Sequence, residues 1–217
     1  MDKPITIYGE KGFGSVPVEA ALTLIGIPYQ VLSPSKPFDV ADDAAIAAVN
    51  PQRQVPALVF PGGEVMTESA AILIWLADRY PDARLAPPPL QRKRAAYLRW
   101  MSFVSSAIYA LFWIRDDPSR VIEGESEGKR LRERLAERIA GCWQVMDSQI
   151  NPGRYLLGGE LSVLDLYVAV VSRWAPRRKR FYAVAPKLAD VVRRVDAEPR
   201  LAAFWAERFP FEDGWEG

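Results

Sequence analysis

The sequence predicts a chain of two parts, a small α/β domain followed by an all-helical domain. Over about the first 80 residues, short β-branched runs alternate with helical stretches in the order β-α-β-α-β-β-α, which suits one small domain. A proline-rich segment at residues 83–89 follows, and it can continue neither a helix nor a central strand. Beyond this segment, apolar residues recur with helical periodicity. These three observations define the predicted fold class.

Each element of the α/β domain has a local signal. Residues 4–8 alternate and are β-branched, which predicts a strand that ends at Gly9. Ser15 then opens a helix that carries Pro17 in its first turn and ends at Gly26. The remaining predicted elements are a strand at 29–32, a helix at 42–49, a hairpin with arms at 57–60 and 64–66, and a helix at 68–80.

The second part is predicted to contain only helices. A long, aromatic-rich amphipathic helix covers residues 91–115, and another, with alternating Arg and Glu, covers 124–150. Shorter helices are expected at 162–174, 186–197 and 199–208. The chain is therefore predicted to consist of a first domain at 1–81, a linker at 82–90 and a helical domain at 91–217.

The charge balance and the hydropathy pattern narrow the choice of partners. Lys and Arg number 28 against 27 Asp and Glu, so the net charge of +1 gives no reason to expect nucleic acid or an anionic membrane. No apolar run approaches the ~18 residues of a membrane span, and the N-terminus lacks a signal-peptide core. A cytoplasmic location is therefore expected.

Two absences constrain the chemistry. The chain has no histidine, which removes the commonest general base and the usual nitrogen ligands of zinc, and no metal is expected. The single cysteine, Cys142, excludes an internal disulfide and a Cys-x-x-Cys redox pair. A reactive thiol would therefore have to arrive with a ligand.

The segment Gln54-Val55-Pro56 stands directly before a predicted strand. Proline cannot donate to a β-ladder, so Pro56 either begins an edge strand in the trans form or follows a cis bond. A cis bond would expose the backbone N–H and C=O of Val55 to an extended peptide ligand, as in β-strand addition. The residues alone leave both forms open.

A second candidate site opens the helix predicted at 68–80. Ser69 presents a hydroxyl and free backbone N–H groups at a helix N-terminus, which stabilises a carboxylate, while Glu68 can hold an ammonium group. An amino-acid head group carries both charges. The alternative is plain capping, with Thr67 as the N-cap residue and Glu68 favouring the helix dipole.

Together these segments resemble a known signature. Residues 50–58, followed by 67–72, are similar to the glutathione-binding signature of cytosolic glutathione transferases, especially bacterial ones. Residues 158–165 resemble the later helix-capping signature of that family, because Ser162 and Asp165 have the spacing of a capping box. The three motifs occur in the right order along the chain. The resemblance implies a thioredoxin-like N-terminal domain, an all-helical C-terminal domain and a homodimer.

The resemblance also implies which residues bind glutathione. Val55, preceding Pro56, would bind the cysteinyl backbone, while Glu68 and Ser69 would bind the γ-glutamyl end. Neighbours for the glycine or glutamyl carboxylates would be Arg53, Gln54 or Lys36.

In this family a Tyr, Ser or Cys near the end of the first strand or the start of the first helix hydrogen-bonds the glutathione sulfur. Ser15 is the best-placed hydroxyl here and is the predicted catalytic residue, with N-capping of the first helix as its alternative role. Tyr8 is the other candidate, with packing as its alternative role. One hydrogen bond to a charged acceptor contributes ~1.5–3 kcal/mol, enough to lower a thiol pKa by about two units.

The second substrate is expected to bind between the domains. The predicted substrate-binding residues are aromatic, namely Phe13, Tyr109, Trp113 and Trp174, and they favour a small apolar electrophile. Their alternative role is ordinary core packing. The basic run at 177–180 superficially suggests RNA, but a solvated loop or helix end, with Arg177 at the pocket mouth, is the preferred interpretation.

The resemblance therefore predicts an enzyme. It would be a glutathione transferase that conjugates glutathione, its co-substrate, to small apolar electrophiles through a stabilised thiolate, in detoxification. The alternatives are glutathione-dependent reduction of organic hydroperoxides and a non-catalytic transferase-like binding module. Neither a nucleic acid nor a membrane is expected as a partner.

Overall fold

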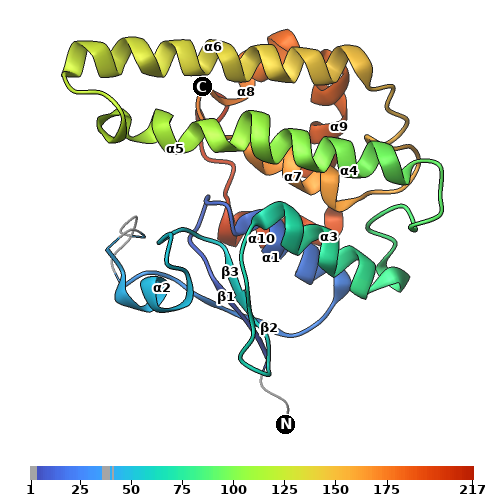
Figure 1. Ribbon diagram of the computed structural model, residues 1–217. Coiled ribbons are helices and arrows are strands. Elements are labelled where there is room, and N and C mark those ends of the chain that lie inside the picture. Colours follow the sequence, from blue (N-terminus) through green and yellow to red (C-terminus); the bar gives the residue numbers. More distant parts are fainter. Residues whose placement is uncertain (1–3, 36–39, 41) are drawn as a thin grey trace.

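The computed structural model describes residues 4–35, 40 and 42–217, so Lys36 lies outside the described residues (Figure 1). The α/β part has the predicted element order, β-α-β-α-β-β-α. Its elements are β1 (Ile5–Tyr8), α1 (Val16–Ile25), β2 (Tyr29–Leu32), α2 (Ala44–Val49), β3 (Ala57–Val59), β4 (Val65–Met66) and α3 (Ser69–Arg79).

The four strands form one mixed sheet in the order β2-β1-β3-β4. Strand β1 runs parallel to β2, whereas β3 is antiparallel to both β1 and β4. Ile7 of β1 lies opposite Leu58 of β3, and both side chains are completely buried where α1 and α3 pack together. This mixed sheet with its helices is the predicted thioredoxin-like arrangement, which is confirmed.

Helices are the only regular elements of the second part among the described residues, apart from an isolated β-bridge between Tyr155 and Gly158. Figure 1 shows its two longest stretches side by side, one formed by α4 and α5 and the other by α6. A six-residue π-helical segment, Val104–Tyr109, joins α4 to α5. The α-helices are α4 (Arg94–Phe103), α5 (Ala110–Asp116), α6 (Glu125–Gln149), α7 (Val163–Val171), α8 (Arg177–Val184), α9 (Pro186–Asp196) and α10 (Ala202–Arg208).

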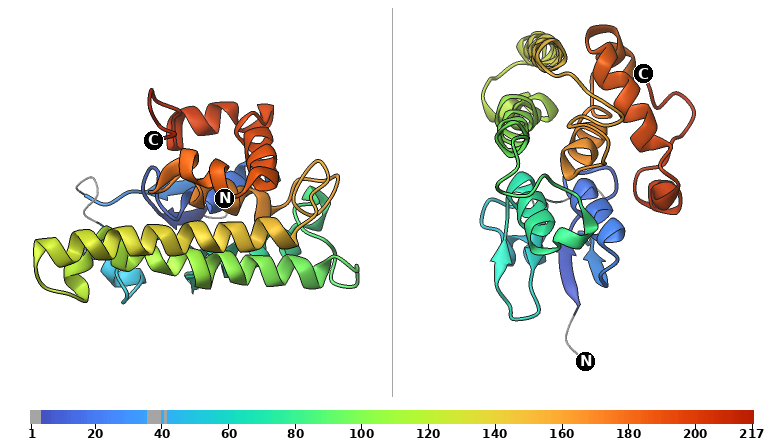
Figure 2. Two further views of the ribbon diagram at one scale, coloured as in Figure 1. Left: turned by 90° about the horizontal axis from the view of Figure 1, so that it is seen from above. Right: turned by 90° about the vertical axis from the view of Figure 1, so that its right-hand side faces the viewer.

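Helix α7 is the centre of the molecule. Its sequence is apolar on nearly all sides, and all nine of its residues are buried, as expected for a helix surrounded by protein. It packs against α1 and α3 of the first part and against α4 and α9 of the second (Figure 2). The connector between α3 and α4 is fixed to it as well, because the Leu85 carbonyl accepts a hydrogen bond from the Val163 N–H at 2.8 Å. The limits predicted for the first domain, the linker and the helical domain, namely 1–81, 82–90 and 91–217, stay a prediction.

The basic run at 177–180 opens α8, and one of its members differs from the expected solvated residue. Arg178 is completely buried. Its guanidinium donates hydrogen bonds to the Asp196 carboxylate at 2.9 Å and to the Ala169 carbonyl at 2.7 Å. A planar guanidinium with several fixed donors can satisfy a carboxylate and a backbone carbonyl at once, which makes its burial tolerable. The expectation of a solvated run is therefore wrong for Arg178, while Arg177 is exposed.

The capping box predicted at the start of α7 is confirmed. Asp165 accepts hydrogen bonds from the Ser162 N–H at 2.8 Å and from the Ser162 hydroxyl at 2.6 Å. No helix among the described residues is both long and apolar enough to cross a lipid bilayer.

Candidate functional site

The segment before β3 forms the first wall of the site. The Val55–Pro56 bond is cis, so the structure has one of the two forms that the sequence left open. Pairing of β3 with β1 begins at Ala57, which places the Val55 backbone before the ladder. The Asn50 side-chain amide donates a hydrogen bond to the Gln54 carbonyl at 2.8 Å, which fixes the loop before Val55. The Gln54 side chain is exposed, as is that of Arg53, whose φ is 54°.

The start of α3 forms the second wall. The N-cap residue is Glu68, so the alternative in which Thr67 caps the helix is wrong. Glu68 has a φ of 66°, which is unfavourable for a residue with a Cβ, and its exposed side chain makes no capping hydrogen bond. Ser69 is buried, and its hydroxyl lies 3.0 Å from the hydroxyl of Tyr167 on α7. A strained backbone such as that of Glu68 is often found where a ligand binds.

The hydroxyl of Ser15 lies inside the protein. Ser15 is completely buried, accepts a hydrogen bond from the Glu10 N–H at 3.2 Å and donates to the Glu10 carbonyl at 3.3 Å. Ser15 is the N-cap residue of α1, as its alternative role predicts, but its side chain makes no capping hydrogen bond. A methyl group on Gly9 would lie 2.4 Å from the Ser15 Oγ, which explains the glycine there. Tyr8 is half-buried in β1, and catalysis by Ser15 or Tyr8 stays a prediction.

The helical part holds the loop before α1 on both sides of Gly12. The indole N–H of Trp174 donates to the Gly12 carbonyl at 2.7 Å, and the Gly12 N–H donates to the Arg208 carbonyl at 3.0 Å. Arg208 also forms a buried ion pair with Glu19 of α1, with its Nε 2.5 Å from the carboxylate. Phe13, next along this loop, is half-buried. Residues of the helical part therefore help to fix the position of this loop.

Aromatic side chains of the helical part line the side facing this loop. The ring of Trp174 lies 4.8 Å from that of Tyr109 and 5.1 Å from that of Phe112. Trp113 is 47% exposed and lies under the Arg120 guanidinium, with no ring contact to Trp174 among the described residues. The structure thus brings Tyr109 and Trp174 together, while Trp113 packs separately.

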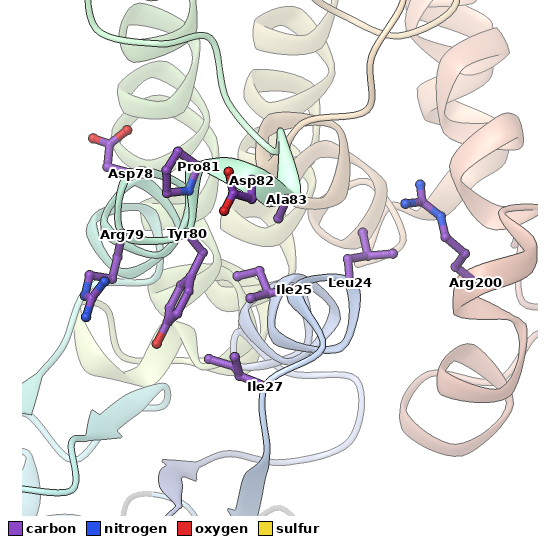
Figure 3. A pocket seen from close by; sticks show the side chains of 10 residues that line it. All are labelled: Leu24, Ile25, Ile27, Asp78, Arg79, Tyr80, Pro81, Asp82, Ala83 and Arg200. Carbon is purple, nitrogen blue, oxygen red and sulfur yellow. The ribbon is translucent and has the colours of Figure 1, made fainter.

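A cavity of about 940 Å³ lies elsewhere, at the opposite end of α3 from Ser69 (Figure 3). It is lined by the last turns of α1 and α3, including Ile25 and Tyr80, with Arg200 on its far side. None of the predicted site residues is among the described residues that line it. This cavity is therefore separate from the candidate site at the domain boundary.

Two residues of the site lie outside the motifs that the sequence analysis identified. The first is Tyr167, whose single hydroxyl in an otherwise nearly aliphatic helix was the available clue, because a buried tyrosine hydroxyl usually has a partner. The second is Gly12, whose peptide group is held by residues far along the chain.

A mixed four-stranded sheet domain, a helical domain and a polar site at their boundary define a two-domain protein of the thioredoxin-like plus helical class. Comparison with known families is consistent with this class. Residues 15–79 match the family model described as glutathione S-transferase, N-terminal domain, and residues 120–208 match glutathione S-transferase, C-terminal domain. The chain belongs to the glutathione S-transferase family, and the predicted class of enzyme, a glutathione transferase, is confirmed.

Individual relatives agree with this assignment. An uncharacterized GST-like protein of Escherichia coli (strain K12), YncG, is 32% identical over 199 residues, which cover 91% of this chain and 95% of the relative. Glutathione S-transferase GstA of Escherichia coli O157:H7 is 26% identical over 154 residues, covering 71% of this chain and 73% of the relative. A glutathione transferase homolog from Sulfitobacter, solved with bound glutathione, has a TM-score of 0.80 and 28% identity, covering 94% of this chain and 97% of that one.

Proposed function

We propose that the protein conjugates glutathione to small apolar electrophiles by stabilising the glutathione thiolate at the domain boundary. The observation that carries the proposal is the aromatic pair Tyr109 and Trp174, which lies against the loop beside the Val55 backbone. A peptide held along Val55 would then have its thiol between polar backbone on one side and aromatic rings on the other. This environment suits attack of a thiolate on an apolar carbon.

Charged groups at the first domain match the ends of glutathione. The Glu68 carboxylate suits the γ-glutamyl ammonium, and the first backbone N–H groups of α3 with the Ser69 hydroxyl suit the neighbouring carboxylate. Arg53 and Gln54, both exposed before Val55, are the proposed neighbours of the glycine carboxylate. Binding along Val55 follows the geometry of strand addition, in which backbone pairing gives affinity.

In the proposed reaction, the thiol proton passes to solvent and the thiolate forms the new sulfur–carbon bond. An aryl halide then releases its halide ion, whereas an enone takes up a proton from solvent at its α-carbon. A pKa that falls by about two units from 8.5 corresponds to about 2.7 kcal/mol of differential stabilisation, which one or two hydrogen bonds to the sulfur supply. Ser15 stays the sequence-based prediction for such a donor, although its hydroxyl is already bonded to the Glu10 backbone.

Calorimetric titration with glutathione tests the binding half of the proposal. We expect binding by the wild type and at least tenfold weaker binding by Glu68→Gln, because a charged contact contributes ~1.5–3 kcal/mol. Glu64→Gln is the matched control, since Glu64 is also exposed but lies on the hairpin between β3 and β4. No binding by the wild type would refute the proposal, and equal binding by Glu68→Gln would refute the γ-glutamyl assignment.

Turnover assays test the chemical half. The wild type should form glutathione conjugates of apolar aryl halides or enones, detected by mass spectrometry. Glutathione oxidation with organic hydroperoxides, without conjugates, would favour the peroxidase alternative. Binding without any turnover would favour the non-catalytic module. Gel filtration separately tests the homodimer, which remains part of the proposal, as does a cytoplasmic location.

A further inference from the structure

One tyrosine of the helical domain reaches into the glutathione-binding domain. Tyr109 is the last residue of the π-helical segment between α4 and α5, and such segments often occur at functional sites. Its ring packs against Trp174 at 4.8 Å and lies edge-on to Tyr167 at 6.2 Å. These two neighbours fix the direction of the phenol.

The hydroxyl of Tyr109 meets the two backbone segments that form the glutathione side of the site. A methyl group built on Gly14 would lie 1.8 Å from the Tyr109 hydroxyl and 3.1 Å from the Val55 carbonyl oxygen. Gly14 does not have a positive φ, so backbone conformation does not require a glycine there. The close approach of the phenol does require it. Gly14, Val55 and the Tyr109 hydroxyl therefore come together at one point.

The hydroxyl of Ser15 has a different environment. It is completely buried, and both its hydrogen bonds go to the Glu10 backbone within its own loop. The two hydroxyls thus flank the same loop, one directed into the protein interior and the other directed at the backbone that the ligand would pair with. Only the second can meet a ligand without giving up an existing hydrogen bond to Glu10.

We propose that Tyr109, from the helical domain, donates the hydrogen bond that stabilises the glutathione thiolate. This inference rests on the proposed function, in which the cysteinyl backbone pairs with Val55 and its side chain leaves from beside the Val55 carbonyl. The thiol proton passes to solvent, and the phenol keeps its own proton and donates it in a hydrogen bond to the sulfur. Tyr109 is then a catalytic residue, and Ser15 holds the loop.

The surroundings of Tyr109 keep the phenol protonated. Burial raises its pKa well above the usual range, and the nearby Tyr167, Glu68 and Asp116 raise it further. A group that stays neutral at every assay pH can act as a donor but not as a base. The expected pH dependence of activity is therefore that of the glutathione thiol itself.

The test is the pKa of the bound thiol, measured by ultraviolet absorbance of the thiolate across a pH series. Tyr109→Phe should raise this pKa by about one to two units, because a hydrogen bond to a charged acceptor is lost while the ring and its packing remain. The dissociation constant for glutathione at a pH where the thiol is protonated should change less than threefold. Tyr97→Phe is the matched control, since the Tyr97 hydroxyl is buried on α4 and has no hydrogen-bond partner among the described residues.

Each outcome decides between the two hydroxyls. A raised thiol pKa in Tyr109→Phe, with an unchanged value in Ser15→Ala, supports the inference. The reverse pattern overturns it and returns the role to Ser15, with the proposed function intact. An unchanged thiol pKa with slower turnover in Tyr109→Phe would also overturn it, because the phenol would then act on the electrophile. If the wild type does not bind glutathione, the proposed function and this inference fail together.

Discussion

Two helices begin near the domain boundary, and their N-termini are built in opposite ways. At α7, Asp165 accepts hydrogen bonds from the Ser162 N–H and hydroxyl, and from the Leu156 N–H at 2.7 Å, all of them buried. At α3, the N-cap residue Glu68 has a φ of 66° and makes no capping bond with its exposed side chain. The hydrogen-bonding groups at the start of α7 are therefore satisfied within the protein. The start of α3 has a strained backbone, and in the proposed function its polar groups bind glutathione.

The difference indicates that the start of α7 contributes to stability, whereas the start of α3 contributes to binding in the proposed function. A capped, buried helix start adds to the free energy of unfolding. An uncapped start with an unfavourable backbone lowers it, and such a start persists where binding benefits from the exposed groups. The two helix starts should therefore respond differently to substitution.

Asp165→Ala should have the largest effect. It removes a carboxylate that accepts three hydrogen bonds and leaves their donors buried, so we expect the free energy of unfolding to fall by about 3 kcal/mol or more. Urea unfolding of the two proteins measures this difference. The protein that remains folded should bind glutathione as the wild type does. Loss of affinity without loss of stability would contradict the purely structural role of this helix start.

The same carboxylate should make stability depend on pH. Burial raises the pKa of Asp165 from 3.8 to about 6, against the lowering effect of its hydrogen bonds. Between these values the folded protein binds more protons at this group than the unfolded chain does. The stability from this group is therefore fully present below about pH 4 and is lost as the pH rises through about 6.

Urea unfolding of the wild type and Asp165→Asn between pH 4 and 7 isolates this contribution. The stability of the wild type relative to the variant should decrease by up to about 3 kcal/mol across the window, and then stay constant. An advantage of the wild type that grew with pH would mean that the hydrogen bonds outweigh desolvation and that the pKa is lowered.

Glu68→Gly should separate binding from stability at the other helix start. Glycine adopts a positive φ without steric cost, so we expect the free energy of unfolding to rise by about 1 kcal/mol. The affinity for glutathione should fall at least tenfold, because the carboxylate is lost. Glu160→Gly is the matched control, since Glu160 is exposed just before α7 and has no positive φ. A stability loss with unchanged affinity in Glu68→Gly would contradict the assignment.

The sequence could predict one of these helix starts better than the other. Ser162 and Asp165 interact within one turn, so their spacing alone predicted the capping box. The strain at Glu68 could not be predicted, because it depends on how the hairpin leads into α3. Thr67 therefore looked like the N-cap residue, and the structure shows otherwise.

The same limit applies to contacts between distant segments. The element order of the first part follows from local signals and was predictable, whereas the residues alone left the form of the Val55–Pro56 bond open. The burial of Arg178 depends on Asp196 of another helix, and the approach of Tyr109 to Gly14 depends on how the two domains pack. Periodicity marks a residue as facing the interior, but it does not identify the partner.

The smallest predicted effect tests whether the two helix starts are independent. Tyr167 lies about one turn into α7, and its hydroxyl lies 3.0 Å from that of Ser69 at the start of α3. Tyr167→Phe should weaken glutathione binding by two- to fivefold, because the Ser69 hydroxyl loses the partner that orients it, a neutral hydrogen bond being worth about 0.5–1.5 kcal/mol. Ser69→Ala and the double variant complete a cycle measured by calorimetry. Coupling between the two substitutions means that α7 positions the binding residues, whereas additive effects would confine α7 to stability.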